Sequence, residues 1–337
     1  MTSTSTRRPL TAVGLLTTAV GVALFVWIVR SVGSREVVDG FRQIGWGLTI
    51  VVFLGGLRFA TRAIAWILCF EPPHRLGFRD AFGAVVAGDA LGSITPLGPI
   101  VGEPTKAAFV RSKAPLAPTL TALAIENVLY SLSAAAMIAA GMVALLFRFQ
   151  LPGNLREISE VAIGAVVAIF AACVWLLWKQ PAILSRIAGL LPGSTPRLER
   201  IRVLEQQVYT FASRRGLAMV PLVSCELAFH ALGVLEAHVS LWMMQGFPPA
   251  LLTSFLVETV NRLITVAFKF VPLQMGVNEA GSALLTQVLG LGAAPGATLA
   301  VVRKVRTLCW TAVGMLLFFK RGLRARAVMR DPDAVKP

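Results

Sequence analysis

The sequence is poor in charged residues. Only 15% of its 337 residues are Asp, Glu, Lys or Arg, whereas soluble domains usually contain about 25%. Hydrophobic residues make up 56%, and the mean hydropathy is +0.72. This balance excludes an ordinary soluble domain, so we expect an integral membrane protein.

Motifs of hydrolytic chemistry are missing as well. The sequence has no G-x-S-x-G nucleophile elbow, no H-E-x-x-H zinc motif and no G-x-x-x-x-G-K-[S/T] phosphate-binding loop. Its four cysteines lie in apolar stretches without C-x-x-C spacing, which is typical of packing residues rather than of disulfides or metal ligands. We therefore expect neither an enzyme nor a cofactor or metal site.

Long apolar runs are what the sequence does contain. A helix needs about 20 apolar residues to cross a bilayer. The first apolar run, residues 10–29, is too long for a signal peptide and lacks a small-residue cleavage site, so we interpret it as a retained anchor. Six runs are predicted full spans: 10–29, 47–70, 117–147, 158–178, 217–244 and 294–319.

Two further apolar stretches, 81–101 and 251–291, are interrupted by proline and glycine. Such stretches form uniform helices poorly and are typical of re-entrant or broken helical hairpins. They share a signature, PLGPIVGE at 96–103 and PLQMGVNE at 272–279. The predicted fold is an all-α polytopic membrane protein with six full transmembrane helices and two Pro-broken re-entrant helical hairpins. The predicted hairpin breaks are Pro96, Gly102, Pro272 and Gly276.

A single integral membrane domain, 1–337, is predicted to contain two similar halves. Each half, 47–147 and 217–319, has a long span, a broken hairpin and another long span. Between them, 179–215 is expected to be a cytoplasmic linker with an amphipathic helix, although a solvated connecting helix fits as well. The predicted crossings place the hairpins on opposite sides, so the halves would be inverted repeats, as in many secondary transporters.

Basic residues are concentrated in the predicted cytoplasmic segments. Most of the 32 Lys and Arg precede the first run, follow the last one, flank the first hairpin or lie in the linker. This distribution predicts a multi-pass protein of the cell inner (cytoplasmic) membrane with both termini in the cytoplasm. The net charge of +15 would then face anionic lipid headgroups rather than nucleic acid.

Ionisable residues also occur inside the apolar stretches. Each costs roughly 2.5 to 3.5 kcal/mol at the centre of a spanning helix, so they must pair, reach the interface or line a wet cavity. Lys269, Lys304 and Arg306 are expected to reach the interface. The acids are Asp89, Glu103, Glu126, Glu226, Glu236, Glu258 and Glu279, and the bases are Arg58, Arg62, Arg262, Lys269, Arg303, Lys304 and Arg306.

Arg58 and Arg62 are four residues apart and therefore share one helix face. Two guanidiniums in this position could clamp a phosphate. The alternative is a static ion pair with Asp89 or Glu126.

Two carboxylates, Glu103 and Glu279, follow the predicted hairpin breaks, where a helix N-terminus favours negative charge. They could cap the helix, coordinate a proton or cation, or hold the opposing arginines. Glu226 and His230 are four residues apart, and Glu236 and His238 follow, so this cluster could bind a metal or relay protons, although further His or Cys at metal-ligand spacing is missing.

The segments GDALGSITPLGPIVGEPTKAAFVR (88–111), IENVLYSLS (125–133) and VPLQMGVNEAGSALLTQVLGLGAAPGATLAVVRKV (271–305) resemble the transmembrane, flippase-like region of lysylphosphatidylglycerol synthases. The resemblance implies a translocation unit without the soluble synthase domain. Asp89 and Asn127 depart from the Asn and Arg of the family pattern, which bears on the substrate more than on the fold. The residues implied by the two motifs are Pro96, Gly102, Glu103 and Glu126, and then Pro272, Gly276, Glu279 and Arg303.

The leading hypothesis is a lipid flippase for an anionic or modified headgroup, with membrane lipids and envelope-lipid biosynthesis enzymes as partners. Its alternatives are a non-transporting scaffold for envelope-lipid or glycan assembly enzymes and a lipid-modifying enzyme that uses His230 and Glu226. In the leading hypothesis, Arg58, Arg62, Arg262 and Arg303 bind the headgroup, and Asp89, Glu103, Glu126, Glu258 and Glu279 balance charge or carry protons.

Overall fold

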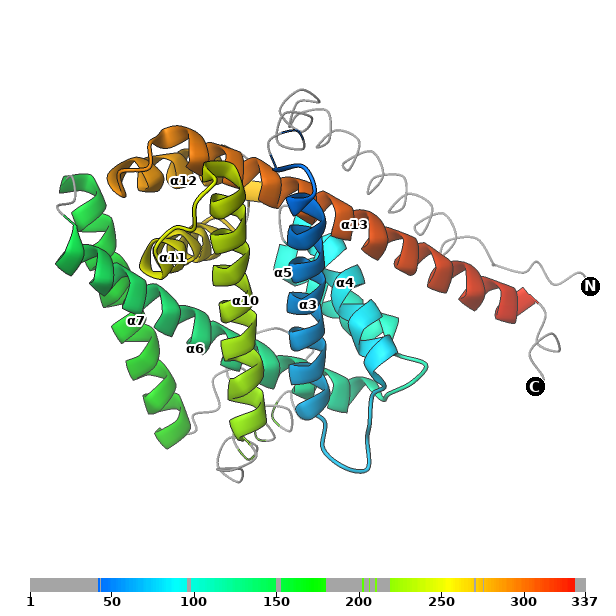
Figure 1. Cartoon of the computed structure of the whole chain (residues 1–337). Helices are drawn as coiled ribbons and strands as arrows, with labels where there is room; N and C mark the ends of the chain where they lie inside the picture. Colours follow the sequence, from blue (N-terminus) through cyan, green and yellow to red (C-terminus); the bar gives the residue numbers. More distant parts are fainter. Residues whose placement is uncertain are drawn as a thin grey trace, which may run out of the picture.

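A computed structural model describes residues 44–95, 98–149, 153–179, 219–269, 271–274 and 276–330, together with residues 42, 202, 206 and 210. All regular structure in these ranges is helical (Figure 1), which confirms the predicted all-α class for this part of the chain. The elements are α3 (Gly47–Leu68), α4 (Phe78–Ile94), α5 (Gly98–Phe109), α6 (Leu116–Arg148), α7 (Gly153–Lys179), α10 (Met219–Gln245), α11 (Leu251–Ala267), the 3-10 helix η1 (Pro272–Gln274), α12 (Val277–Val288) and α13 (Ala293–Arg330).

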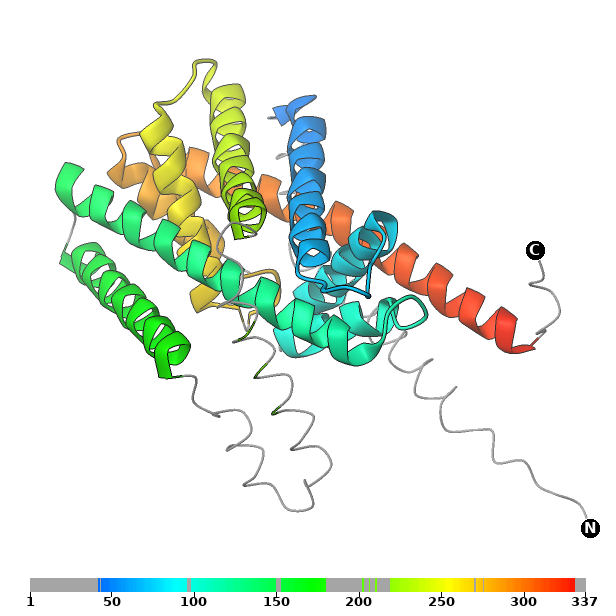
Figure 2. The same ribbon diagram turned by 90° about the horizontal axis from the view of Figure 1, so that it is seen from below.

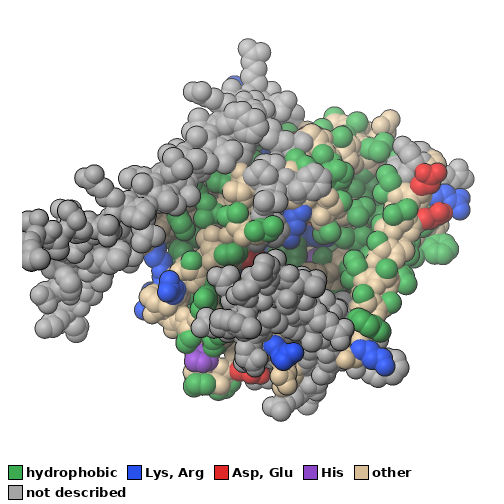
Figure 3. Space-filling model, turned by 180° about the vertical axis from the view of Figure 1, so that it is seen from behind, with side chains coloured by type: hydrophobic (Ala, Val, Ile, Leu, Met, Phe, Trp, Pro, Cys, Tyr) green, Lys and Arg blue, Asp and Glu red, His purple; other side chains and the backbone are tan. Residues whose placement is uncertain are grey.

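Three helices of this part, α3, α6 and α10, are long and apolar enough to cross a membrane. Figure 3 shows hydrophobic side chains spread widely over the described part of this face, as expected where a protein contacts lipid. The predicted spans 158–178 and 294–319 lie within α7 and α13. The predicted span 10–29 and nearly all of the linker 179–215 lie outside the described residues, and six full spans stay a prediction.

The first predicted hairpin corresponds to α4 and α5. The helices pack antiparallel, because Gly92 lies against Gly98 and Gly88 lies against Gly102. They have 17 and 12 residues, hence lengths of about 25 and 18 Å, and each is shorter than the roughly 30 Å hydrocarbon layer. The break falls between Ile94 and Gly98, and Pro96 itself lies outside the described residues.

Gly102 does not lie at this break, so that prediction is wrong. It lies inside α5, where a Cβ atom would come within 2.9 Å of the carbonyl oxygen of Gly88. The glycine is needed because α4 and α5 approach closely at this position, as small residues allow in membrane helices.

The second predicted hairpin corresponds to α11, η1 and α12. Its helices also have 17 and 12 residues. Between them the backbone turns through positive φ angles at Leu273, Gln274 and Gly276, of which only the glycine adopts such an angle without strain. Pro272 begins η1 and Gly276 precedes α12, so both predicted break residues lie at the interruption.

Both halves therefore have the same order of elements, a long helix, two shorter ones and another long helix. The first long helices, α3 and α10, lie side by side and antiparallel (Figures 1 and 2), since Gly47 lies against Met243 and Arg58 reaches Glu236. α13 crosses behind them and packs against α4, where Gly314 approaches the backbone of Val86. That the short helix pairs α4–α5 and α11–α12 enter from opposite sides of the membrane stays a prediction.

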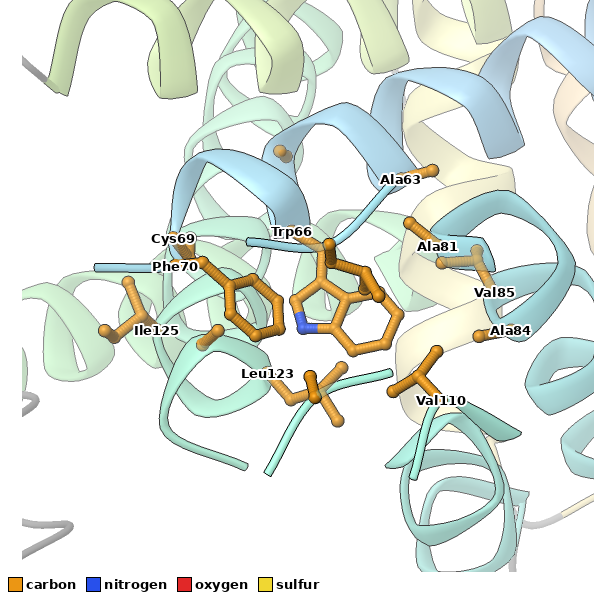
Figure 4. Close-up of a cluster of buried hydrophobic side chains, with 14 of the residues drawn as sticks. Ala63, Trp66, Cys69, Phe70, Ala81, Ala84, Val85, Val110, Leu123 and Ile125 are labelled. Carbon is orange, nitrogen blue, oxygen red and sulfur yellow. The ribbon is translucent and has the colours of Figure 1, made fainter. Parts of the chain in front are cut away.

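A hydrophobic cluster around Trp66 joins α3, α4, α5 and α6 (Figure 4). Trp66 is 1% exposed and packs among Phe70, Val85, Val110 and Leu123. This cluster fixes the α4–α5 pair against α3, which carries the first arginines of the site described next.

Candidate functional site

Two fully buried carboxylates and four arginines form a cluster between α3, α10, α11 and α13. Glu236 of α10 and Glu258 of α11 each have no exposed surface. Arg58 Nη1 lies 3.4 Å from Glu236 Oε2, and its Nη2 lies 3.3 Å from Glu258 Oε1. Arg262 and Arg303 donate to Glu258 at 2.7 and 2.6 Å. Arg306 donates to Glu236. We call these six residues the arginine cluster.

Helix geometry brings the cluster together. Glu258 and Arg262 are four residues apart on α11, so they share one face and form an ion pair within the helix. Glycine makes room for the ions: a Cβ atom at Gly233 would lie 2.4 Å from Glu258 Oε1, and one at Gly55 would lie 2.8 Å from Arg306 Cδ. Larger residues at these positions would push the charged side chains aside.

The cluster has more positive than negative charge. Four guanidiniums face two carboxylates, which leaves a net charge of +2 when all are ionised. Three buried nitrogens, Arg303 Nη1, Arg303 Nε and Arg262 Nε, have no hydrogen-bond partner, although Arg303 Nε lies 3.5 Å from Glu236 Oε1. Unsatisfied charged donors are costly away from water, so the cluster is suited to a further anion.

A separate ion pair, between Arg62 and Glu126, lies one helical turn further along α3. Arg62 donates from Nε and Nη2 to the two carboxylate oxygens of Glu126, both at 2.8 Å. This bidentate arrangement is the strongest geometry for the two groups. It corresponds to one of the two static pairs considered for Arg62 from sequence.

Two aromatic side chains lie between this pair and the cluster. The guanidinium of Arg62 lies 4.1 Å from the ring centre of Tyr130, and that of Arg58 lies 4.5 Å from the ring centre of Phe229. Arg262 donates to the Tyr130 hydroxyl at 3.0 Å. These cation–π contacts and this hydrogen bond hold the arginines in fixed orientations.

The cluster has one edge near the surface. Asp89 of α4 is exposed and lies within electrostatic range of Lys106, Arg62, Arg306 and Arg58. The side chain of Arg306 is 18% exposed, the largest fraction in the cluster. Lys and Arg side chains are visible near the middle of the face in Figure 3. Asp89 therefore lies near two arginines of the cluster, Arg58 and Arg306.

The two carboxylates that follow the breaks lie apart from the arginine cluster. Glu103 accepts a hydrogen bond from Lys106 at 2.7 Å on the same helix. Glu279 accepts from the backbone N–H of Gly276 at 2.8 Å, which caps α12, and it pairs with Lys304. Capping, one of the roles considered for these carboxylates, is present at Glu279.

The expectation that Lys304 and Arg306 reach the interface is wrong. Both lie well inside α13, and both pair with a carboxylate of another helix. An ion pair within the bundle was available, so extension to the headgroups was unnecessary. Lys269, in contrast, is exposed just after the end of α11.

The sequence model described as lysylphosphatidylglycerol synthase TM region matches residues 13–314, a range that contains every residue of the arginine cluster. The chain belongs to this family. Neither the curated proteins nor the solved structures give a match. Membership in the lysylphosphatidylglycerol synthase TM region family links the chain to membrane lipids.

In this family member, sequence reasoning found part of the site. It singled out Arg58, Arg262, Arg303 and Glu258, which the structure brings together. It grouped Glu236 with His230 and expected Arg306 to reach the interface, so it did not predict that these two residues pair. The available signal was the cost of burying charge, because a set of deep arginines requires carboxylates from other helices. Helix packing determines which carboxylates pair with these arginines.

Glu226 and His230 of this family member join Ser133 of α6. Ser133 Oγ donates to Glu226 Oε2 at 3.2 Å, and His230 Nε2 lies 3.0 Å from the same hydroxyl. In a catalytic triad the acid would orient the histidine through its second nitrogen, but here Glu226 contacts the serine and His230 Nδ1 has no partner. No group of three or more potential metal ligands occurs among the described residues.

Proposed function

We propose that this protein is a lipid flippase that moves a lipid with an anionic or modified headgroup between the leaflets of the cell inner membrane. The observation that carries the proposal is the arginine cluster, in which three buried guanidiniums and the partly exposed one of Arg306 meet two carboxylates. A headgroup phosphate would supply the missing negative charge inside the bundle.

The chemistry of the cluster supports a phosphate ligand. Guanidiniums bind phosphate oxygens with two parallel N–H donors, and they hold water less tightly than ammonium groups do. Arg303 is the central residue of this proposal, because its Nη2 is fixed by Glu258 while its Nη1 is buried without a partner. The carboxylates would hold the arginines in place when no lipid is bound.

In this mechanism, Asp89, Lys106, Arg62 and Arg306 would form the entrance for the headgroup. The acyl chains would stay in the membrane, along the apolar surfaces of the spanning helices. The short pairs α4–α5 and α11–α12 would be re-entrant hairpins that enter from opposite faces, so that the buried charges lie between them. Alternating access would come from movement of one half against the other.

Leaflet-resolved transport in proteoliposomes tests the proposal. We expect the purified protein to speed the exchange of fluorescent phosphatidylglycerol between leaflets, and we expect Arg303→Lys to reduce this rate at least tenfold. Lysine keeps the positive charge but lacks the forked donors. Arg156→Lys is the matched control, because Arg156 is 69% exposed and pairs with Glu160 on its own helix.

The proposal fails if neither phosphatidylglycerol nor its aminoacylated form moves faster with the protein than without it. It also fails if Arg303→Lys transports like the wild type. Each variant is compared at equal reconstituted amount, with the melting temperature in detergent as a check on folding.

Both carboxylate oxygens of Glu126 already accept from Arg62, so this ion pair needs no ligand. It favours a second candidate, a non-transporting scaffold for envelope-lipid assembly enzymes. In such a protein the buried charges only fix the helices. Neutralising matched partners together, as in Arg62→Met with Glu126→Leu, would then leave both abundance and cellular function intact. Loss of transport in this stable double variant would favour the flippase.

A further inference from the structure

A cavity lies on the other side of Tyr130 from the arginine cluster. Its volume is about 790 Å³, within the usual range of roughly 300 to 1,000 Å³ for ligand pockets. It is lined by α6, α7, α10 and α11, mostly with apolar side chains such as Met137, Ala140, Leu227 and Phe255. Two of these helices, α6 and α10, are long and apolar enough to cross a membrane, so a cavity between them is suited to lipid chains.

Polar groups interrupt the apolar lining where Ser133, Glu226 and His230 meet, and again at His238, whose Nδ1 lies 3.1 Å from Ser254 Oγ. His230 is 7% exposed, and the Tyr130 ring stacks on it with an interplanar angle of 13° and a centre distance of 6.4 Å. Tyr130 in turn contacts Arg62 and Arg262, so it separates the cavity from the arginine cluster. The cavity is therefore a site of its own.

The hydrogen bonds of this trio determine the tautomer of His230. Ser133 has one hydroxyl proton, which faces two acceptors, the Tyr130 backbone carbonyl at 2.9 Å and Glu226 Oε2 at 3.2 Å, and so is not available to His230. The contact between Ser133 Oγ and His230 Nε2 must then use a proton on Nε2. It follows that Nδ1 of the neutral ring carries a lone pair, and this buried atom has no donor. A ligand with a hydrogen-bond donor would satisfy it.

We propose that this cavity binds the hydrocarbon part of a membrane lipid that carries a hydroxyl group, with the hydroxyl donating to His230 Nδ1. A hydroxyl offers a donor without adding a charge, whereas Glu226 beside it would repel an anionic headgroup. The proposal is independent of lipid transport by the arginine cluster.

Photolabelling of the detergent-purified full chain tests it with two probes that differ by one hydrogen-bond donor. The first is a long-chain alcohol with a diazirine in its alkyl chain, and the second is its methyl ether. We expect saturable labelling of the peptides around 129–140 and 223–235, with half-saturation at an at least fivefold lower concentration for the alcohol. His230→Phe keeps a ring but lacks Nδ1, so we expect it to abolish the difference between the probes.

Ala136→Trp places a large side chain in the cavity lining and is expected to reduce saturable labelling by both probes at least fivefold. Ala124→Trp is its matched control, because Ala124 is exposed on the same helix and lies outside the lining. Ala140→Phe repeats the test if Ala136→Trp lowers the melting temperature. Arg303→Lys should leave labelling unchanged, which separates this site from the proposed transport function.

Equal half-saturation of alcohol and ether in the wild type would overturn the hydroxyl assignment. Labelling that rises linearly with probe concentration and is the same in Ala136→Trp would overturn the site altogether, since it would reflect only lipid around the protein.

Discussion

Arg303 donates to Glu258 at 2.6 Å through one terminal nitrogen, while its other terminal nitrogen is buried without a partner. The residues come from α13 and α11, helices whose packing brings together groups 45 positions apart. An ion pair that leaves a buried donor unused is costly if the protein has only to be stable. The arrangement is understandable if the donor is used by a ligand.

Glu258→Gln should destabilise the protein strongly. It would leave Arg58, Arg262 and Arg303 with one fewer buried counter-charge, and breaking such an arrangement costs about 3 to 5 kcal/mol. The measurement is the melting temperature in detergent together with membrane abundance. Glu160→Gln is the control, since its side chain is 55% exposed and an exposed pair contributes about 0 to 1 kcal/mol. Equal melting temperatures for the two variants would contradict the prediction.

The pair between Arg62 and Glu126 should show strong coupling in a double-mutant cycle. Arg62→Met and Glu126→Leu each leave the other charge without its bidentate partner, so each single change should destabilise by about 2 kcal/mol or more. The double variant should recover at least half of the sum of the two losses. Strictly additive losses would show that the two groups do not depend on each other.

Gly102→Ala should disturb the packing of α4 on α5. The new methyl group would lie 2.9 Å from the carbonyl oxygen of Gly88, which is backbone and moves only with its helix, so we expect a loss of about 1 to 3 kcal/mol. Gly164→Ala, in α7 with no atom within 4 Å of the added carbon, should be neutral or stabilise by up to about 1 kcal/mol. The test is the difference in melting temperature between these two variants.

Variants of Glu279 should separate its two roles. Glu279→Gln keeps an oxygen that can accept from the Gly276 N–H but loses the charge facing Lys304, whereas Glu279→Ala loses both interactions. We expect the melting temperature to fall in the order wild type, Glu279→Gln, Glu279→Ala, with the last step reflecting a cap of about 1 kcal/mol. Identical values for the two variants would exclude capping as a stabilising contact.

Sequence reasoning predicted the interruption of both short helix pairs because proline and glycine leave strong local signals. The turn at Pro272 and Gly276 depends on backbone angles that those residues set themselves. Gly102 was misplaced for a related reason. A glycine favours a bend and a close helix contact equally, and only the approach of Gly88 distinguishes the two.

The arginine cluster was only partly predictable. Arg58 and Glu258 attract attention because any deep ionisable residue is costly in a bilayer. Glu236 and Arg306 have the same chemistry, but nothing local shows that they meet, since they are 70 positions apart on helices α10 and α13. Their pairing also explains why Arg306 lies in the bundle instead of extending to the headgroups.

By itself, the sequence determined that the chain is helical and suited to a membrane, because hydropathy and helix breaks act over neighbouring residues. Tertiary structure alone decided which charges meet, that two carboxylates serve four arginines, and that Ser133 joins Glu226 and His230 beside an apolar cavity. The physical reason is that these features join residues far apart in the sequence. An ion pair or a cavity wall is formed by side chains from different helices, and only the packing of those helices sets the distances between them.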